Sequence, residues 1–371
     1  MKIAHIITGL NNGGAEAVLY RLCTNDISVT HTVISLMGMG KYGPLLQETG
    51  VEVHCLNMPA GRITFSGLYS LYKLLKKSKP NAVQTWMYHA DLIGGVIARL
   101  AGVKNIFWNI RHSVLEKGKS KRNTILIAKF CSWISPFIPK QIICCANKAL
   151  AVHAKNGYQR NKMVVIANGY ELDKFTPNSQ LALDTRNELL LNENVVLLGM
   201  VGRYDPLKDH TNLLAALSQL KHQFDFKCLL VGKDLSTTNN ELISEIEKQG
   251  LQSHIVLLEQ RNDIPAIMNA LDLHILSSSS EAFPNVIAEA MACGTPCVST
   301  DVGDAALIVG EAGWVVPAQD SRQLASAITQ ALTLKQDSLK WLELQNQARN
   351  RILEHFSIET MINKYHDVWN S

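Results

Sequence analysis

The chain has 371 residues, of which 47% are hydrophobic and 18% are charged, and its formal net charge is +4. This length exceeds one ordinary core and fits two domains, while the composition is typical of a folded α/β protein and excludes a disordered one. The basic excess is too small to indicate nucleic-acid binding, but it is compatible with an anionic ligand or an anionic membrane surface.

The cysteines indicate a reducing compartment and no metal site. The eight cysteines lie mostly in apolar runs, as Cys144 and Cys145 do, which is typical of buried thiols. Cys293 and Cys297 flank a Gly-Thr-Pro turn with no second Cys or His pair nearby, so a zinc site would lack ligands. No run of about eighteen apolar residues is present, and we expect a cytoplasmic protein without a membrane-spanning helix.

In chain order, the first half alternates apolar runs of strand length with helical patterns. Residues 2–9 form the first expected strand, and Gly13 and Gly14 then open a helix over residues 15–22. The later strands of this half are expected at residues 31–36, 51–56, 82–86, 105–110, 141–146 and 162–167. This alternation predicts a doubly wound parallel sheet.

A polar stretch over residues 168–192 predicts a domain boundary with a hinge near Pro177. A second series of alternating strands and helices follows it, with strands expected at residues 195–201, 226–231, 255–258, 273–276, 296–299 and 313–316. The chain ends in helical patterns over residues 322–334, 339–352 and 358–369. We therefore expect a first domain over residues 1–176 and a second over residues 177–356.

Residues 271–300 contain the densest group of chemical signals. A short strand ends in four serines, and a loop from Glu281 to Asn285 then leads into a helix that Gly294 closes. Free N–H groups at such a helix start suit a phosphate, while the carboxylates of Glu281 and Glu289 are good acceptors for sugar hydroxyls. The combination favours a sugar nucleotide, although an acidic loop that answers the helix dipole would show the same pattern.

The sequence from position 281 onward, Glu281-Ala-Phe-Pro-Asn-Val-Ile-Ala-Glu289-Ala-Met-Ala-Cys-Gly294-Thr-Pro296, resembles the glutamate-x7-glutamate signature of the retaining glycosyltransferases of family 4. This resemblance implies the α/β GT-B fold, in which two Rossmann-like, doubly wound parallel-sheet domains face a central cleft. It also implies that domain 1–176 binds the acceptor, that domain 177–356 binds the nucleotide sugar, and that the last helix, 357–371, joins the first domain.

The same resemblance suggests a role for each residue of the motif. Glu281 would hold the hydroxyls of the donor sugar, Glu289 would hold the ribose, and the sugar or diphosphate would be contacted by the loop residues Phe283, Pro284, Asn285 and Val286. Gly13 and Gly14 resemble the glycine-rich first loop of these enzymes, where backbone amides approach a phosphate. A tight turn without a ligand explains these two glycines equally well.

Arg203 and Lys208 follow the first strand of the second domain, in a loop where open α/β sheets bind ligands. Their positive charges would neutralise a leaving nucleoside diphosphate and so take the place of a metal ion. The family has a matching Gly-Arg and Lys-Gly motif, but Asp209 stands here where glycine is usual. An exposed salt bridge is the alternative interpretation of this basic pair.

His112 closes the fifth strand of the first domain, and by resemblance it is our candidate for the residue beside the donor sugar and the reacting centre. His89 is the rival candidate. A purely structural role is the alternative for either histidine.

A basic and then apolar segment over residues 117–133 predicts contact with an anionic membrane surface. Its cations are Lys117, Lys119, Lys121 and Arg122, and its apolar residues are Ile125, Leu126, Ile127, Phe130 and Trp133. An ordinary helix packed on the sheet after a lysine-rich loop is the alternative.

We therefore expect a retaining, metal-independent glycosyltransferase, cytoplasmic and peripheral on the inner face of the membrane. It would move a sugar from a nucleotide-sugar donor, a UDP-sugar, to a lipid-linked or polysaccharide acceptor in bacterial surface glycan synthesis, with no other cofactor and no nucleic-acid partner. A glycosidase is disfavoured, because its two carboxylates must flank the scissile bond about 5 Å apart. The alternatives are a non-hydrolysing nucleotide-sugar epimerase and a non-catalytic nucleotide-sugar binder.

Overall fold

The computed structural model describes residues 1–112, 115, 122–191 and 195–371. The described chain divides into two compact units, each treated by itself below. Unit 1 comprises Met1–Gly169 and Ile358–Ser371, and unit 2 comprises Tyr170–Ser357. Among the described residues, no helix combines the length and the apolar character that a membrane crossing requires.

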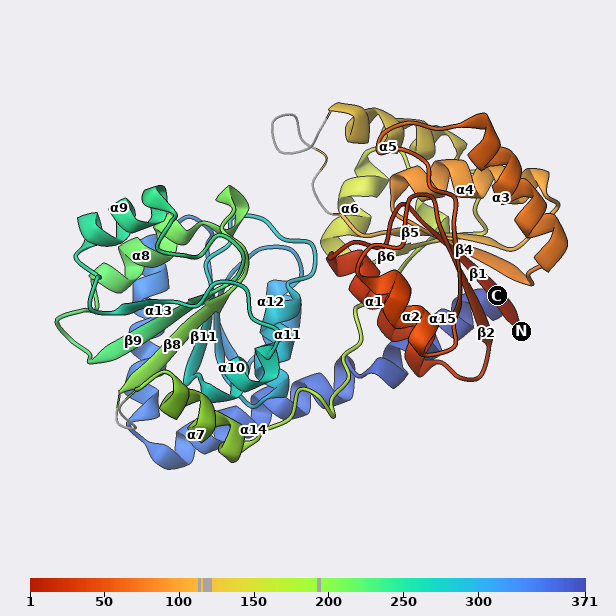
Figure 1. Cartoon of the computed structure of the whole chain (residues 1–371). Coiled ribbons are helices and arrows are strands. Elements are labelled where there is room, and N and C mark those ends of the chain that lie inside the picture. Colours follow the sequence, from red (N-terminus) through yellow and green to blue (C-terminus); the bar gives the residue numbers. More distant parts are fainter. Residues whose placement is uncertain (113–114, 116–121, 192–194) are drawn as a thin grey trace. The chain divides into compact units, whose positions relative to one another are not determined.

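The described part of unit 1 is built on a parallel sheet with the strand order β3-β2-β1-β4-β5-β6-β7 (Figure 1). Its strands are β1 (Lys2–Ile7), β2 (Thr30–Ser35), β3 (Glu52–Cys55), β4 (Ala82–Trp86), β5 (Ile106–Ile110), β6 (Gln141–Cys144) and β7 (Met163–Val165). The sheet is covered on both faces, which explains why its strands are near-continuous apolar runs in the sequence. The strand order reverses between β1 and β4, the neighbours at the middle of the sheet.

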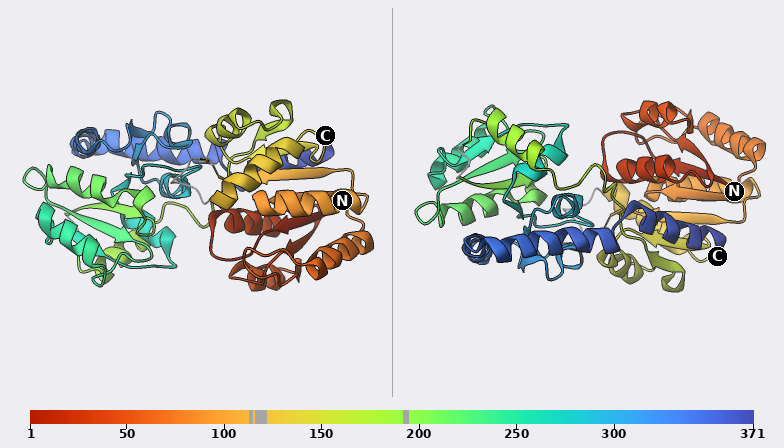
Figure 2. Two further views of the ribbon diagram at one scale, coloured as in Figure 1. Left: turned by 90° about the horizontal axis from the view of Figure 1, so that it is seen from above. Right: turned by 90° about the horizontal axis from the view of Figure 1, so that it is seen from below.

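Helices cover both faces of this sheet (Figure 2). They are α1 (Gly14–Asn25), α2 (Tyr42–Glu48), α3 (Phe65–Ser78), α4 (Tyr88–Leu100), α5 (Arg122–Ile134), α6 (Asn147–Lys155) and α15 (Ile358–Asn370). Helices α1 and α15 share a core with Ile3 and Ile7 of β1, whereas α4 packs on the opposite face, where Gly94 meets Ile6. The last helix of the chain is therefore part of the core of unit 1.

Unit 2 repeats the same architecture with the strand order β10-β9-β8-β11-β12-β13 in its described residues. Its strands are β8 (Val196–Val201), β9 (Phe226–Val231), β10 (Ile255–Leu257), β11 (Leu273–Leu276), β12 (Cys297–Thr300) and β13 (Gly313–Val316). Its helices are α7 (Ser179–Glu188), α8 (His210–Ser218), α9 (Asn240–Gln249), α10 (Ile264–Ala270), α11 (Asn285–Ala292), α12 (Ala305–Val309), α13 (Ser321–Lys335) and α14 (Ser338–His355). Here the order reverses between β8 and β11.

The polar stretch over residues 168–192 differs from its prediction. It contains α7, which belongs to unit 2, and the division between the units falls after Gly169 instead of near Pro177. Asn178 caps α7 by accepting a hydrogen bond from Leu181 N, and Arg186 pairs with Asp272 at 2.9 Å. Polar contacts hold α7 in place. Its sequence therefore lacks the apolar pattern from which a helix is predicted.

Candidate functional site

The loops after β8 and β11 meet at the point of unit 2 where the strand order reverses. Ligands of open α/β sheets bind outside the carboxyl ends of the strands at such a point. The first loop contains Arg203 and Lys208, and the second contains Ser278 and Glu281. The residues of unit 2 that the sequence predicts to bind the nucleotide sugar therefore include three, Arg203, Lys208 and Glu281, that lie in loops at one edge of this sheet.

Lys208 and Glu281 form an ion pair between these two loops. The Nζ atom of Lys208 donates to Oε1 of Glu281 at 2.6 Å, and the hydroxyl of Ser278 donates to the same oxygen at 2.8 Å. The side chains of Lys208 and Glu281 are only 19% and 16% exposed. Two hydrogen-bond donors thus fix the position of the Glu281 carboxylate. Because both side chains are largely shielded from water, the attraction between their charges is stronger than it would be at an exposed site.

The serines that follow β11 join the two loops. The Ser277 hydroxyl donates to the carbonyl oxygens of Lys208 and Asp209, both at 3.0 Å. The backbone N–H of Ser279 donates to the carbonyl of Leu207 at 2.8 Å. These bonds set the position of the loop that contains Lys208.

Asp209 adopts the left-handed conformation, with φ 51° and ψ 56°. A glycine is the usual residue for this conformation, but aspartate tolerates it better than most side chains. Asp209 also caps α8, because its carboxylate accepts a hydrogen bond from Asn212 N at 3.2 Å. Asp209 therefore forms a left-handed turn of the kind that glycine favours, and it also caps the helix.

Arg203 pairs with its neighbour Asp205, and its side chain is 63% exposed. The guanidinium donates twice to one carboxylate oxygen, at 3.0 and 2.8 Å. Burial opposes the ionisation of Asp205, but the Leu207 N–H and the Arg203 guanidinium outweigh it and hold the pKa of that carboxyl below its ordinary value. Arg203 would have to exchange this partner for a diphosphate, whereas Lys208 already lies at Glu281.

Two buried histidines near Lys208 were not singled out from the sequence. Burial, followed by the charge of Lys208, lowers the pKa of His210 to about 4 and that of His274 to about 3. Both imidazoles are therefore neutral at neutral pH, and the Nε2 atom of each has no hydrogen-bond partner. Neither histidine could be recognised from the sequence, because His210 lies within the helix α8 and His274 within the strand β11, and neither belongs to a known motif.

The loop from Phe283 to Val286 leads into α11. Phe283 is buried against the ring of Phe356, and Tyr170 donates to Oδ1 of Asn285 at 2.7 Å. Pro284 is the N-cap residue of α11, and its side chain accepts no hydrogen bond from the backbone of the first helical turn. Val286 and Glu289 are half-buried on the helix that follows.

The loop after β12 lies against the backbone of Glu281. Gly303 has a φ of 60°, and a Cβ atom there would lie 2.3 Å from the carbonyl oxygen of Ala282. The N–H of Asp304 donates to this same carbonyl at 3.1 Å. Glu281 is thus held from both sides, through its side chain and its backbone.

In unit 1, Gly13 and Gly14 begin α1 at the carboxyl end of β1. The carboxylate of Glu16 folds over Gly13, since a Cβ atom on Gly13 would lie 2.4 Å from its Oε2 atom. Burial raises the pKa of Glu16, and its own backbone N–H and the charge of Arg111 oppose that rise. A phosphate at Gly13 would therefore have to displace a carboxylate that the sequence prediction did not consider.

His112 is exposed and follows Arg111 directly after β5. Arg111 donates to Oδ1 of Asn168 and lies over the ring of Trp86 at 5.6 Å. His112, like Gly13 and Gly14, belongs to unit 1, whereas the other predicted site residues belong to unit 2. The structure thus groups the predicted residues into two sets, each at the carboxyl edge of its own sheet.

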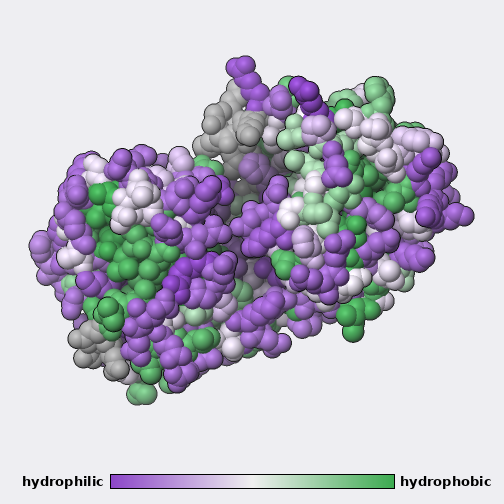
Figure 3. Space-filling model, viewed as in Figure 1, coloured by the Kyte–Doolittle hydropathy of each residue, from purple (hydrophilic) through white to green (hydrophobic). Residues whose placement is uncertain are grey.

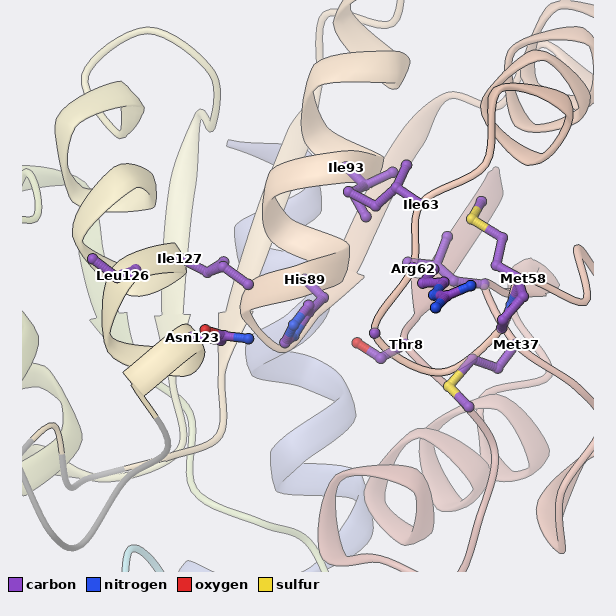
Figure 4. A pocket seen from close by; sticks show the side chains of 13 residues that line it. Thr8, Met37, Met58, Arg62, Ile63, His89, Ile93, Asn123, Leu126 and Ile127 are labelled. Carbon is purple, nitrogen blue, oxygen red and sulfur yellow. The ribbon is translucent and has the colours of Figure 1, made fainter.

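His89, the rival histidine, lies in the first turn of α4 and is half-buried, and burial lowers its pKa. The preceding Met87 has a φ of 70° and a ψ of 157°, a conformation that is strained for any residue with a side chain. Such strain is concentrated at functional sites. His89 also lines a pocket of about 290 Å³ in unit 1 (Figure 4).

The described residues contain one group that meets the geometry of a metal site, His5, Cys23 and His31, in the core of unit 1. Three of its four ring nitrogens are already hydrogen-bonded: Trp86 donates to Nδ1 of His5 at 3.2 Å, and Nε2 of His5 lies 2.9 Å from Nδ1 of His31. The fourth, Nε2 of His31, lies 3.4 Å from a carboxylate oxygen of Asp26. This group is far in sequence from the motif residues of unit 2. All eight cysteines are free; seven are buried and Cys55 is half-buried.

Helix α5 begins at Arg122, while Lys117, Lys119 and Lys121 lie outside the described residues. The apolar residues of this helix do not all pack inward. Leu126, Phe130 and Trp133, spaced by four and three positions, are exposed, whereas Ile125 and Ile127 are half-buried. Residues at this spacing share one helical face.

Family models match both halves of the chain. The model described as Glycosyltransferase Family 4 matches residues 12–174, and the model described as Glycosyl transferases group 1 matches residues 195–334. The chain belongs to glycosyltransferase family 4. The resemblance identified from the residues around Glu281 is thereby confirmed.

Several relatives of this family 4 glycosyltransferase align with most of its length. A UDP-Gal:alpha-D-GlcNAc-diphosphoundecaprenol alpha-1,3-galactosyltransferase of Escherichia coli is 29% identical over 81% of this chain and 78% of its own. The capsular polysaccharide biosynthesis glycosyltransferase CapM of Staphylococcus aureus is 26% identical over 89% of this chain and 88% of its own.

Solved structures show that the glycosyltransferase has the GT-B fold. Anabaena HepE, determined in complex with UDP-glucose, matches with a TM-score of 0.85 and 21% identity over 100% of this chain and 99% of its own. WaaG, a glycosyltransferase involved in lipopolysaccharide biosynthesis, matches with a TM-score of 0.73 and 17% identity over 99% of both chains. The predicted fold class of two parallel-sheet α/β domains is confirmed.

Proposed function

We propose that this glycosyltransferase transfers a sugar from a UDP-sugar to a lipid-linked acceptor during the synthesis of a bacterial surface glycan. We further propose that the anomeric configuration is retained and that no metal ion takes part. The relatives support the substrate class, because the Escherichia coli enzyme is named for UDP-Gal and a diphosphoundecaprenol acceptor and the Staphylococcus aureus enzyme for a capsular polysaccharide. HepE, which has the same fold, was determined with UDP-glucose.

The observation that carries this proposal is the pairing of Lys208 with Glu281 where the strand order of unit 2 reverses. The carboxylate, oriented by Lys208 and Ser278, accepts hydrogen bonds from the hydroxyls of the donor sugar. The ammonium lies beside it and stabilises negative charge that develops on the leaving diphosphate. One cation thus orients the sugar-binding group and assists departure of the nucleotide.

The rest of the donor fits the surrounding loop. The start of α11 suits a phosphate oxygen, because the positive end of the helix dipole lies there. Glu289 follows one to two turns later and accepts from the ribose hydroxyls. Arg203, once released from Asp205, adds a second cation for the diphosphate, so a divalent ion is not needed.

The test is a transfer assay with the purified protein, a panel of UDP-sugars, and GlcNAc-diphosphoundecaprenol as the acceptor. We expect one UDP-sugar to yield a lipid-linked disaccharide, seen by mass spectrometry, with an α linkage by NMR. A β-linked product from an α-linked donor would overturn retention. Interconversion of the free donor without transfer would indicate an epimerase, and saturable donor binding without turnover with any acceptor would indicate a non-catalytic binder.

A further inference from the structure

We propose that the pocket of unit 1 beside His89 binds the diphosphate and the first prenyl units of a polyprenyl-diphosphate acceptor. This inference rests on the proposed function and assigns part of the acceptor to named residues. The pocket has a volume of about 290 Å³, near the lower end of small-molecule sites. It therefore accommodates the proximal part of a long lipid and not the whole chain.

Most of the pocket wall is hydrocarbon or thioether. The apolar side chains come from the loops after β2 and β3 and from α4 and α5, and they are Leu36, Met37, Met58, Ile63, Ile93 and Ile127. Methionine is flexible and polarizable, so Met37 and Met58 adapt to a branched prenyl chain better than a rigid wall would. A water-filled sugar site would not need this lining.

Four polar residues share the same pocket: Thr8, Arg62, His89 and Asn123. Figure 4 shows the His89 ring between Asn123 and Thr8, with Ile93 and Ile63 higher in the view. The Thr8 hydroxyl is buried without a hydrogen-bond partner, and no carboxylate of the described residues pairs with Arg62. These groups can donate hydrogen bonds to a diphosphate, and a guanidinium suits phosphate oxygens especially well.

The apolar lining continues onto the surface of the unit. Leu126 lines the pocket and is also 65% exposed, and it shares the outer face of α5 with Phe130 and Trp133. Ile63 lines the pocket from the loop just before α3, two positions from the exposed Phe65. Figure 3 shows hydrophobic residues at the surface of unit 1 in the region where Figure 1 labels α3 to α5. A prenyl chain leaving the pocket would therefore stay on an apolar surface that also suits a lipid bilayer.

The test measures binding of farnesyl diphosphate, farnesol and inorganic diphosphate to the full chain by calorimetry, without a donor sugar. We expect farnesyl diphosphate to bind at least about tenfold more tightly than diphosphate, because its tail leaves water. Leu126→Asp should remove this advantage. Leu100→Asp is the matched control, because Leu100 is also 65% exposed but lies at the end of α4 outside the pocket.

Arg62→Gln separates the two ends of the ligand. It should weaken binding of farnesyl diphosphate and leave binding of farnesol unchanged, with thermal unfolding like that of the parent, since Arg62 is exposed. Equal affinities for farnesyl diphosphate and diphosphate, or a Leu126→Asp variant that binds like the parent, would overturn the pocket assignment. In that case transfer to the undecaprenol acceptor still tests the proposed function separately, because the binding assay involves neither donor nor turnover.

Discussion

Lys208 donates to Glu281 at 2.6 Å across 73 positions of sequence, and Ser278 donates to the same carboxylate oxygen. The sequence predicts that the lysine binds the diphosphate and that the glutamate binds the sugar. Their contact makes the two proposed roles interdependent, because the lysine that is proposed to compensate charge on the nucleotide also orients the carboxylate. The first prediction tests this interdependence.

Replacing Lys208 with Ala should lower the rate of transfer about 10²-fold, as expected for loss of one preorganised donor. The double variant Lys208→Ala/Glu281→Ala should be less impaired than the product of the two single effects, since each single change already disrupts the pair. Steady-state kinetics of all three variants measure this coupling. The matched control is Lys340→Ala, which breaks the exposed pair with Asp337 and should change nothing. Strictly multiplicative effects would contradict the interdependence.

The second prediction separates the two glutamates. Glu289→Ala should weaken UDP binding with a smaller effect on kcat, because a ribose contact is present equally in the ground state and the transition state. Glu281→Ala should lower kcat, since the proposed contact of Glu281 with the sugar would strengthen as positive charge develops on the ring. Calorimetry with UDP and steady-state kinetics measure the two effects. Small and equal effects of both variants would refute the assignment.

The third prediction concerns metal ions. Transfer should persist in EDTA, because Lys208 and Arg203 are proposed to provide the positive charge that a divalent ion would otherwise supply. The rate is measured before and after dialysis against the chelator. Arg203→Ala should lower this EDTA-resistant rate, while the charge-preserving Arg203→Lys should retain part of it. Complete loss of activity in EDTA with recovery in manganese would disprove the metal-independent mechanism.

The fourth prediction is that the segment over residues 117–133 binds anionic membrane. Binding to anionic vesicles should decrease as salt increases, because electrostatic attraction is screened within a Debye length. Sedimentation with the vesicles should be lost in a variant with serine at Lys117, Lys119, Lys121 and Arg122. Trp133→Asp should weaken it separately, because that indole is 71% exposed on α5. UDP binding should be unaffected in both. Full sedimentation of the serine variant would rule out this electrostatic contact.

The fifth prediction is a loss of stability in mild acid. Burial lowers the pKa of His153 to about 4, of His210 to about 4 and of His274 to about 3, from an ordinary value of 6.5. Below pH 6.5 the unfolded chain therefore binds protons that the folded chain does not, so stability is fully present above that pH. Each of these histidines lowers the free energy of unfolding by about 1.4 kcal/mol per pH unit as the pH falls from 6.5 toward the pKa of that histidine in the folded state.

Urea unfolding followed by tryptophan fluorescence measures this effect, and the midpoint should decrease steadily from pH 6.5 to pH 4.5. His254→Gln is a control, because this histidine is much less buried than the other three. It should preserve most of the decrease. A midpoint that stays constant over this range would contradict the neutral state of the buried histidines.

The positions of the strands could be predicted from the sequence, because a parallel strand that is covered on both faces must be apolar along its length. β4, β9, β11 and β13 begin and end at the residues that were predicted. Helix α7 was missed for the opposite reason, since its stability depends on a cap at Asn178 and an ion pair with Asp272 and not on an apolar stripe.

The sequence by itself determined the family and predicted where the donor site lies, because Glu281, Glu289 and the intervening loop form one local motif of fixed spacing. Only the tertiary structure decided which side chains act together. The pairing of Lys208 with Glu281, the left-handed turn at Asp209 and the unpartnered Thr8 hydroxyl in the pocket all depend on loops that converge at the carboxyl ends of neighbouring strands. Such contacts join distant positions, and no local pattern of residues encodes them.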